Sequence, residues 1–169
     1  MTDVDAVARQ YGLAPLPVEG GLYRRTWAGP PDATGRPAGS AIIVLLTADG
    51  GFSALHRLPI DEVWHFYRGD PLELLLLPED GEARVELLGH AAGQHVQLTV
   101  PAGTWMGARV VPGGHWSLCG TTMAPGFVPE DYEGGDATEL AARHPEQAAR
   151  IHALFRPDAA SRMSEDPDA

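Results

Sequence analysis

This sequence of 169 residues has one cysteine, no long apolar run and few basic residues. Its single cysteine, Cys119, cannot form a disulfide within the chain, which is typical of a protein in a reducing cytoplasm. No stretch approaches the roughly 20 apolar residues that span a bilayer, and no apolar run after a basic stretch marks a secretory signal. We therefore expect a cytoplasmic protein with no membrane partner.

Basic residues are outnumbered by acidic ones, 12 to 23, which gives a net charge of −11. A surface that binds nucleic acid usually carries a basic stripe, and none is visible, so we expect no nucleic-acid partner. The length fits one domain, which we place at residues 1–155. The polar tail, residues 156–169, has little apolar surface to bury and is expected to be disordered.

Short apolar runs separated by Gly, Pro and Asp turns recur about every ten residues from residue 40 to residue 123. This spacing is typical of an antiparallel β-sandwich or barrel. Helical spacing is confined to the ends of the chain, at residues 2–12 and 137–155, and Pro145 divides the second segment into two short helices. We predict an all-β barrel with a short N-terminal helix and C-terminal helices.

One stretch, GGFSALHRLPIDEVWHFYRG (50–69), resembles the first conserved motif of the cupins, in which a Gly, two His, a Glu and a Gly occur at this spacing. The second cupin motif, Pro-x-Gly followed three positions later by His, resembles PAGTWM (101–106). In this sequence the motif positions are held by Gly50, His56, Leu58, Glu62 and Gly69, and by Pro101, Gly103 and Met106.

Four ordered segments are similar to a narrower group, the single-domain cupins of formerly unknown function. They read EGG-x-Y, DE-x-WHFY-x-G-x-PL, VPAG-x-W and APGF, and the likeness covers roughly residues 10–135. The resemblance implies a cupin-type double-stranded β-helix (jelly-roll) with a pocket inside, and a fold like that of deoxysugar epimerases. It also implies dimers formed through strand edges. We expect a homodimer, with the apolar run 72–78 as a candidate contributor.

The resemblance maps the usual cupin metal ligands, three His and one Glu, onto His56, Leu58, Glu62 and Met106. Leucine cannot ligate a metal, and a thioether suits Cu(I) better than harder divalent ions. One His and one Glu are too few for a tight divalent site. Strand alternation places His65 on the opposite face from Glu62 unless a β-bulge intervenes. We expect no cofactor; the alternative is a divalent metal on His56, Glu62 and His65.

Without a metal, His56 and Glu62 would form an acid–base pair inside the barrel. Burial in an apolar cavity raises the pKa of a carboxyl and an adjacent imidazole lowers it, so such a pair can move protons near neutral pH. Tyr23 or Tyr67, whichever faces inward, would be a second acid. The predicted catalytic residues are therefore His56, Glu62 and Tyr23.

Five residues are predicted to contact the substrate. Arg24 and Arg25 point to opposite faces of their strand, and an inward Arg25 would anchor a carboxylate or a phosphate. Apolar walls are expected from Leu58, Trp64, Phe66 and Met106.

Three functions follow from these residues. The first is a metal-independent epimerase, isomerase or cyclase that acts on a carbonyl-bearing, partly apolar small molecule. The second is a metal-dependent oxygenase or lyase. The third is a small-molecule binding protein without chemistry, in which His56 and Glu62 are simply a hydrogen-bonded buried pair. The high Ala, Gly, Pro and Arg content hints at a GC-rich bacterial genome and at secondary metabolism.

Overall fold

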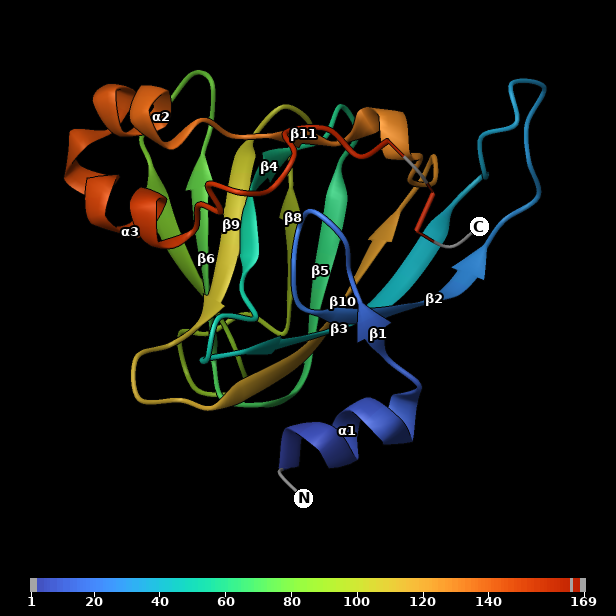
Figure 1. Cartoon of the computed structure of the whole chain (residues 1–169), viewed down its shortest axis with the longest axis horizontal. Coiled ribbons are helices and arrows are strands. Elements are labelled where there is room, and N and C mark those ends of the chain that lie inside the picture. The colour runs from blue at the N-terminus through green and yellow to red at the C-terminus, as the bar shows by residue number, and fades with distance from the viewer. Residues whose placement is uncertain (1–2, 165, 168–169) are drawn as a thin grey trace.

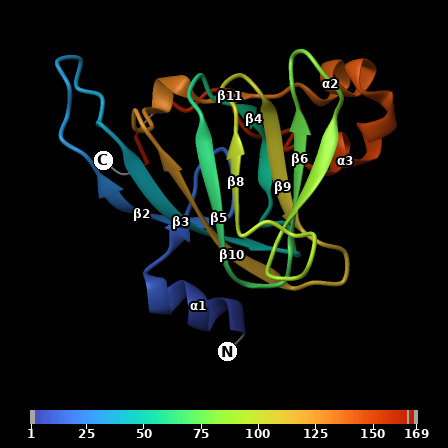
Figure 2. The same ribbon diagram turned by 180° about the vertical axis from the view of Figure 1, so that it is seen from behind.

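Two antiparallel β-sheets face each other and enclose the apolar centre of the chain (Figures 1 and 2). This arrangement comes from a computed structural model that describes residues 3–164, 166 and 167. Across the described residues, the larger sheet has the strand order β1-β2-β3-β10-β5-β8 and the smaller one the order β11-β4-β9-β6-β7. The predicted all-β jelly-roll with helices at both ends is confirmed.

Each apolar run predicted between residues 40 and 123 forms a strand, and one longer strand and two very short ones lie outside this range. The larger sheet contains β1 (Ala14–Pro15), β2 (Leu22–Ala28), β3 (Ser40–Thr47), β5 (Glu62–Gly69), β8 (Gln97–Val100) and β10 (Trp116–Met123). The smaller sheet contains β4 (Ser53–Arg57), β6 (Leu72–Leu77), β7 (Arg84–Leu88), β9 (Trp105–Val110) and β11 (Glu133–Gly134).

Helices cover the outer faces of both sheets. Helix α1 (Asp3–Tyr11) ends at Gly12, whose φ of 63° suits glycine, and it buries Val7 against Leu45 and Leu118 of the larger sheet. The smaller sheet is covered at the other side of the molecule in Figure 1, where Leu140 and Ile151 pack on it. The elements there are α2 (Ala137–Arg143), η2 (Pro145–Gln147) and α3 (Ala148–Ala153), and η1 (Pro129–Asp131) precedes them.

Strand β6 is buried on both faces, so it is not available for a dimer contact. Its leucines are at most 1% exposed, and β9 and β7 pair with its two edges. Its one charged residue, Glu73, accepts hydrogen bonds from Arg109 of β9 and Arg150 of α3 and so ties the helix to the sheet. The suggestion that residues 72–78 contribute to a dimer interface is therefore wrong.

The tail also differs from the expectation of disorder, because residues 156–163 pack along β11 (Figure 1). The backbone N–H of Gly134 donates to the carbonyl of Ser161 (2.8 Å), and Met163 is buried. The guanidinium of Arg156 donates to the carbonyls of Gly50 and Phe52, each at 2.8 Å. Backbone pairing and one apolar anchor order this part of the tail despite its polar composition. No helix in residues 3–164, 166 and 167 is long and apolar enough to cross a membrane.

Candidate active site

A pocket lies between the two sheets, where the C-terminal segment crosses the end of the barrel. Together with its open mouth it contains about 570 Å³ of unfilled space. Its lining is mainly apolar, with a few ionisable groups. The lining residues are Leu16, Glu19, Tyr23, Arg25, Ser40, Ile42, His56, Leu58, Glu62, Thr121, Met123, Phe127, Met163 and Pro167.

His56 enters the pocket from β4 and is only 1% exposed. Its Nδ1 lies 2.7 Å from the carbonyl oxygen of Ala54, and a carbonyl can only accept a hydrogen bond. Nδ1 therefore carries the hydrogen, which leaves a lone pair on Nε2 when the ring is neutral. The ring of Tyr132 stacks on the imidazole with 5.1 Å between centroids and fixes its plane. The free lone pair of a neutral ring is thus on Nε2.

Glu62 opens β5 on the opposite sheet, 7% exposed, and its carboxyl is part of the same pocket. Burial raises the pKa of Glu62 from 4.5 to about 7; the charge of His56 lowers it and that of Glu19 raises it. Hydrogen bonding from Thr121 also favours the ionised carboxylate. A carboxyl with this pKa can both donate and accept a proton near neutrality.

Trp64 lies beside Glu62 on the inner face of β5 and contributes to the polarity of the site. Its indole N–H lowers the pKa of Glu62, yet Nε1 is fully buried and makes no hydrogen bond of normal geometry with the described residues. The indole therefore acts on Glu62 as a nearby dipole rather than as a hydrogen-bond donor.

Glu19 is a pocket residue that the sequence analysis missed. Its Oε1 accepts a hydrogen bond from the hydroxyl of Ser53 (2.7 Å) and lies 3.9 Å from Nε2 of His56. Glu19 is the first residue of the EGG-x-Y segment, which is similar to the family's motif. The motif alone does not indicate that this side chain lies next to His56. The site therefore holds two carboxyl groups and one imidazole.

The turn that carries Glu19 has an unusual backbone. Val18 has a φ of 68°, and the N–H of Glu19 donates to the carbonyl of Pro17 at 2.7 Å, which closes a γ-turn around Val18. A β-branched residue in this region costs about 1–3 kcal/mol. Gly20 follows with a φ of 101°, and a Cβ there would lie 2.7 Å from the carbonyl oxygen of Phe52. Strained turns of this kind concentrate at functional sites.

Two of the predicted polar residues face the pocket. Tyr23 is buried in its wall, whereas Tyr67 is 46% exposed on the outer face, so Tyr23 is the inward tyrosine of the two. Arg25 lies on the same face of β2, half-buried, and lines the pocket, while Arg24 is exposed. Arg25 pairs across the sheet with Ile42, which places its side chain in the same cross-strand row as Thr121.

The predicted apolar walls are only partly right. Leu58 lines the pocket, but Trp64, Phe66 and Met106 do not: they pack in the core behind it. These three side chains do point into the barrel, as strand alternation predicts. They lie in its filled part, where they contact other core side chains and not the pocket. The apolar walls are instead formed by Leu16, Ile42, Met123, Phe127 and Met163.

The alternative metal set is not assembled. The β5–β8 register runs without a shift from Glu62 to His65, so His65 points away from the pocket. There its Nε2 lies 2.9 Å from the hydroxyl of Thr122, and the amide of Gln97 lies 3.2 Å from Nδ1. Within the part of the chain that the structure describes, no three His, Cys, Asp or Glu side chains are placed to hold a metal ion. The residues present do not fit the metal that the fold suggests.

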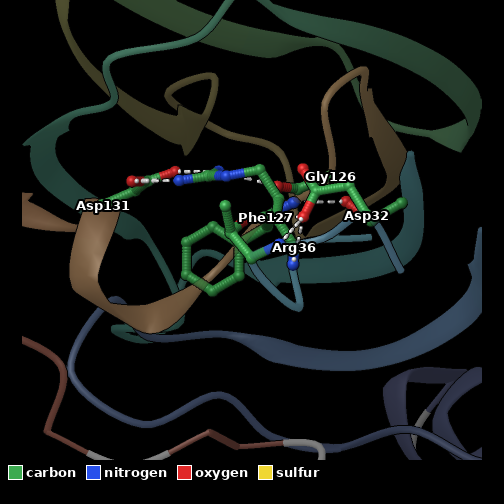
Figure 3. Close-up of polar contacts among 7 residues, drawn as sticks. Asp32, Arg36, Gly126, Phe127 and Asp131 are labelled. Carbon is green, nitrogen blue, oxygen red and sulfur yellow. Dashed lines mark hydrogen bonds and ion pairs between the residues drawn. The ribbon is translucent and has the colours of Figure 1, made fainter. Parts of the chain in front are cut away.

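An arginine outside the pocket holds one of its walls. Figure 3 shows the Arg36 guanidinium between Asp131 and the carbonyl of Gly126, next to Phe127. Its two hydrogen bonds to the carboxylate are 2.6 and 3.0 Å long, and the bond to Gly126 is 3.0 Å. The N–H of Phe127 also donates to the hydroxyl of Ser40 (2.9 Å). This network fixes the backbone that presents the Phe127 ring to the pocket.

Replacing Arg36 with lysine is expected to lower the free energy of unfolding by about 1–2 kcal/mol, because an ammonium cannot make the two-bond contact with Asp131. Urea denaturation followed by fluorescence measures the change. Arg84→Lys is the matched control: its exposed pair with Glu86 is expected to contribute at most about 0.5 kcal/mol. Equal losses in the two variants would contradict a structural role for the Arg36 network.

Comparison with known proteins agrees with this architecture. Residues 5–134 match the family described as Cupin superfamily (DUF985). Protein SO0799 from Shewanella oneidensis has a solved structure with 32% identity and a TM-score of 0.83, over 94% of this chain and 100% of that one. A hypothetical protein from Leishmania major gives 28% and 0.80, over 90% and 98%. No curated protein matches this chain significantly.

More distant structures share the fold alone. A cupin 2 domain-containing protein from Halorhodospira halophila is 16% identical with a TM-score of 0.57, over 85% of this chain and 88% of that one. Oxalate decarboxylase from Bacillus subtilis is 13% identical with a TM-score of 0.56, over 93% of this chain and 44% of that one. Because the family match covers most of the residues and the architecture agrees, the chain belongs to the cupin superfamily, in the family DUF985.

Proposed function

We propose that this cupin is an acid–base enzyme of the epimerase, isomerase or cyclase type, which acts on a carbonyl-bearing, partly apolar small molecule without a metal. One observation carries the proposal. His56, whose Nδ1 is bonded to the carbonyl of Ala54 and whose Nε2 faces the pocket, shares a largely apolar pocket with a carboxyl, Glu62, whose pKa burial raises to about 7. Groups poised in this way suit proton transfer at neutral pH.

The proposed step moves one proton from carbon to oxygen. Nε2 of His56 takes a proton from the carbon next to the substrate carbonyl, and the electron pair of that C–H bond becomes the C=C bond of an enol. The carbonyl oxygen receives a proton from Glu62. In an isomerisation, His56 returns its proton to the former carbonyl carbon, while a hydroxyl on the adjacent carbon gives its proton to Glu62 and becomes the new carbonyl. In an epimerisation, the enol oxygen gives its proton back to Glu62 as the carbon is reprotonated. For an epimerisation, Tyr23 is the proposed donor on the opposite face.

The rest of the pocket supports a small substrate with an apolar part. Arg25 is the only Arg or Lys among the described lining residues and is the proposed anchor for a carboxylate or phosphate. The remaining wall is mostly aliphatic or aromatic, with Leu58 and Phe127 on it. A molecule with one anionic end, a carbonyl and an apolar remainder would match this distribution.

The chain lacks the residues for two other kinds of carbonyl chemistry, which are Schiff-base formation by a lysine and attack by a cysteine thiolate. The sequence contains no lysine, so all 12 of its basic residues are arginines and no lysine Schiff base can form. Cys119 is fully buried, and burial raises the pKa of its thiol to about 12, so it does not supply a thiolate nucleophile. Acid–base chemistry by His56 and Glu62 is the carbonyl chemistry that the pocket's own side chains support.

The test is solvent exchange. The protein is incubated in D₂O with a panel of 2-oxo acids, hydroxyketones and 1,3-diketones, and deuterium incorporation next to the carbonyl is followed by NMR. We expect catalysed exchange for at least one class, inhibited by compounds that fill the apolar part of the pocket. Binding of a panel compound without any exchange would contradict the proposal and favour a binding protein.

Metal removal separates this proposal from a metal-dependent oxygenase or lyase. We expect protein purified without a metal-affinity tag to contain less than about a tenth of an equivalent of Fe, Mn, Ni, Cu or Zn, because a working metal site has to be occupied. Exchange activity should survive prolonged dialysis against a chelator. Stoichiometric metal, together with activity that is lost on chelation and restored by metal, would contradict the metal-independent mechanism.

Three further expectations stay predictions: a homodimer, a cytoplasmic location and a place in secondary metabolism.

A further inference from the structure

The pocket contains an ionisable group that the proposed step does not use, the carboxylate of Glu19. Nδ1 of His56 is occupied by the carbonyl of Ala54, so the side of the ring that changes protonation is the Nε2 side. Glu19 lies on that side, with Oε1 at 3.9 Å from Nε2. This separation is too long for a hydrogen bond and short enough for strong attraction to a protonated ring.

The fold holds Glu19 in place at three points. The hydroxyl of Ser53 donates to its carboxylate, and the N–H of Ala54 donates to its backbone carbonyl at 2.9 Å. Since Ala54 also accepts the hydrogen bond from His56, one residue of β4 binds both Glu19 and the imidazole. The third point is the strained γ-turn around Val18, which sets the direction in which Glu19 leaves the chain.

We propose that Glu19 is a positioning residue of the acid–base site: its carboxylate stabilises the imidazolium that forms when Nε2 of His56 accepts the substrate proton. The inference deepens the proposed function and rests on it for the identity of the proton donor. The proton moves between carbon, His56, Glu62 and the carbonyl oxygen, so Glu19 takes no part in the transfer and acts through its charge alone.

Other charged and titratable groups near the site do not replace Glu19. Arg25 faces the pocket from β2, and its positive charge would oppose an imidazolium. Tyr132 stacks on the ring, and burial and the charge of Glu19 both raise its pKa, so it remains neutral. Arg156, which lowers the pKa of Tyr132, also carries positive charge. In the proposed step Glu62 starts protonated, so the negative charge next to the His56 ring at the start of the reaction is that of Glu19.

Glu19→Gln tests the role, because it removes the charge and keeps an oxygen for Ser53. We expect kcat for exchange of the panel compound to fall about tenfold to a hundredfold, while KM changes less than about threefold. Glu19→Asp keeps the charge and is expected to recover most of the rate. Glu146→Gln is the control for net charge, since Glu146 is exposed on η2. A Glu19→Gln enzyme with normal kcat, or one that Asp does not rescue, would overturn the proposal.

A second readout does not depend on any substrate. Because the charge of Glu19 raises the pKa of Glu62, the Glu62 carboxyl in Glu19→Gln should titrate at lower pH than in the wild type, as followed by ¹³C NMR. In Glu19→Asp and Glu146→Gln the Glu62 titration should stay near that of the wild type. An unchanged Glu62 titration in Glu19→Gln would overturn the electrostatic role of Glu19. Absence of exchange in the wild type, with the titration shifted as expected, would count against the proposed function and leave the role of Glu19 supported.

Discussion

Replacement of His56 with asparagine is expected to abolish catalysed exchange and to leave the protein folded. The asparagine amide N–H can take the place of Nδ1–H and donate to the carbonyl of Ala54, but nothing then occupies the position of Nε2. General-base catalysis contributes about 10²–10⁴-fold, so the loss should be of that size. Exchange of the panel compound in D₂O and far-ultraviolet circular dichroism measure the two expectations.

The matched control for this variant is His115→Asn, since His115 is exposed on the turn before β10 and does not line the pocket. It should exchange at the wild-type rate. If His56→Asn loses both its activity and its folded spectrum, the same measurements are made on His56→Gln, whose longer amide reaches toward the position of Nε2. A folded His56→Asn protein that exchanges normally would show that His56 is not the base.

Replacement of Glu62 with glutamine is expected to stabilise the protein at alkaline pH while it removes activity. In the folded protein the pKa of Glu62 is raised from 4.5 to about 7. The native state therefore holds this proton more tightly than the unfolded chain, and wild-type stability falls as the pH rises from about 4.5 to about 7. Glutamine mimics the protonated carboxyl at every pH and avoids this loss.

The expected size follows from the pKa difference. One pKa unit corresponds to about 1.4 kcal/mol, so Glu62→Gln should exceed the wild type in free energy of unfolding by about 3 kcal/mol at pH 8. Near pH 4 the two proteins should be equally stable. Chemical denaturation at both pH values measures the difference, with Glu146→Gln as a control expected to be pH-independent within about 0.5 kcal/mol. A constant offset between Glu62→Gln and wild type at all pH values would contradict the assignment.

Much of the fold could be predicted from the sequence because each strand carries its own pattern. In β5, Glu62, Trp64 and Phe66 alternate with outward residues, and the buried positions agree with this alternation. Turn residues between the runs mark the strand ends, and Pro145 separates α2 from α3. The packed part of the tail escaped because its order depends on pairing with β11, a two-residue strand with no pattern of its own.

The candidate site was only half predictable. Motif spacing led to His56 and Glu62, and strand parity correctly separated His65 from them. Glu19 escaped because it lies in a turn, where no periodicity says which way a side chain points, and its contact with Ser53 joins residues 34 positions apart. Strand alternation also predicts only that a residue such as Met106 faces inward. It does not show whether that part of the barrel is filled by other side chains or open as a pocket.

The central claim is that an enclosed carboxyl beside His56 exchanges protons near neutral pH. A ¹³C NMR titration of labelled glutamate side chains, with the Glu62 signal assigned from Glu62→Gln, tests it most directly. The account predicts a Glu62 midpoint near pH 7. A midpoint near the ordinary value of 4.5 would contradict it.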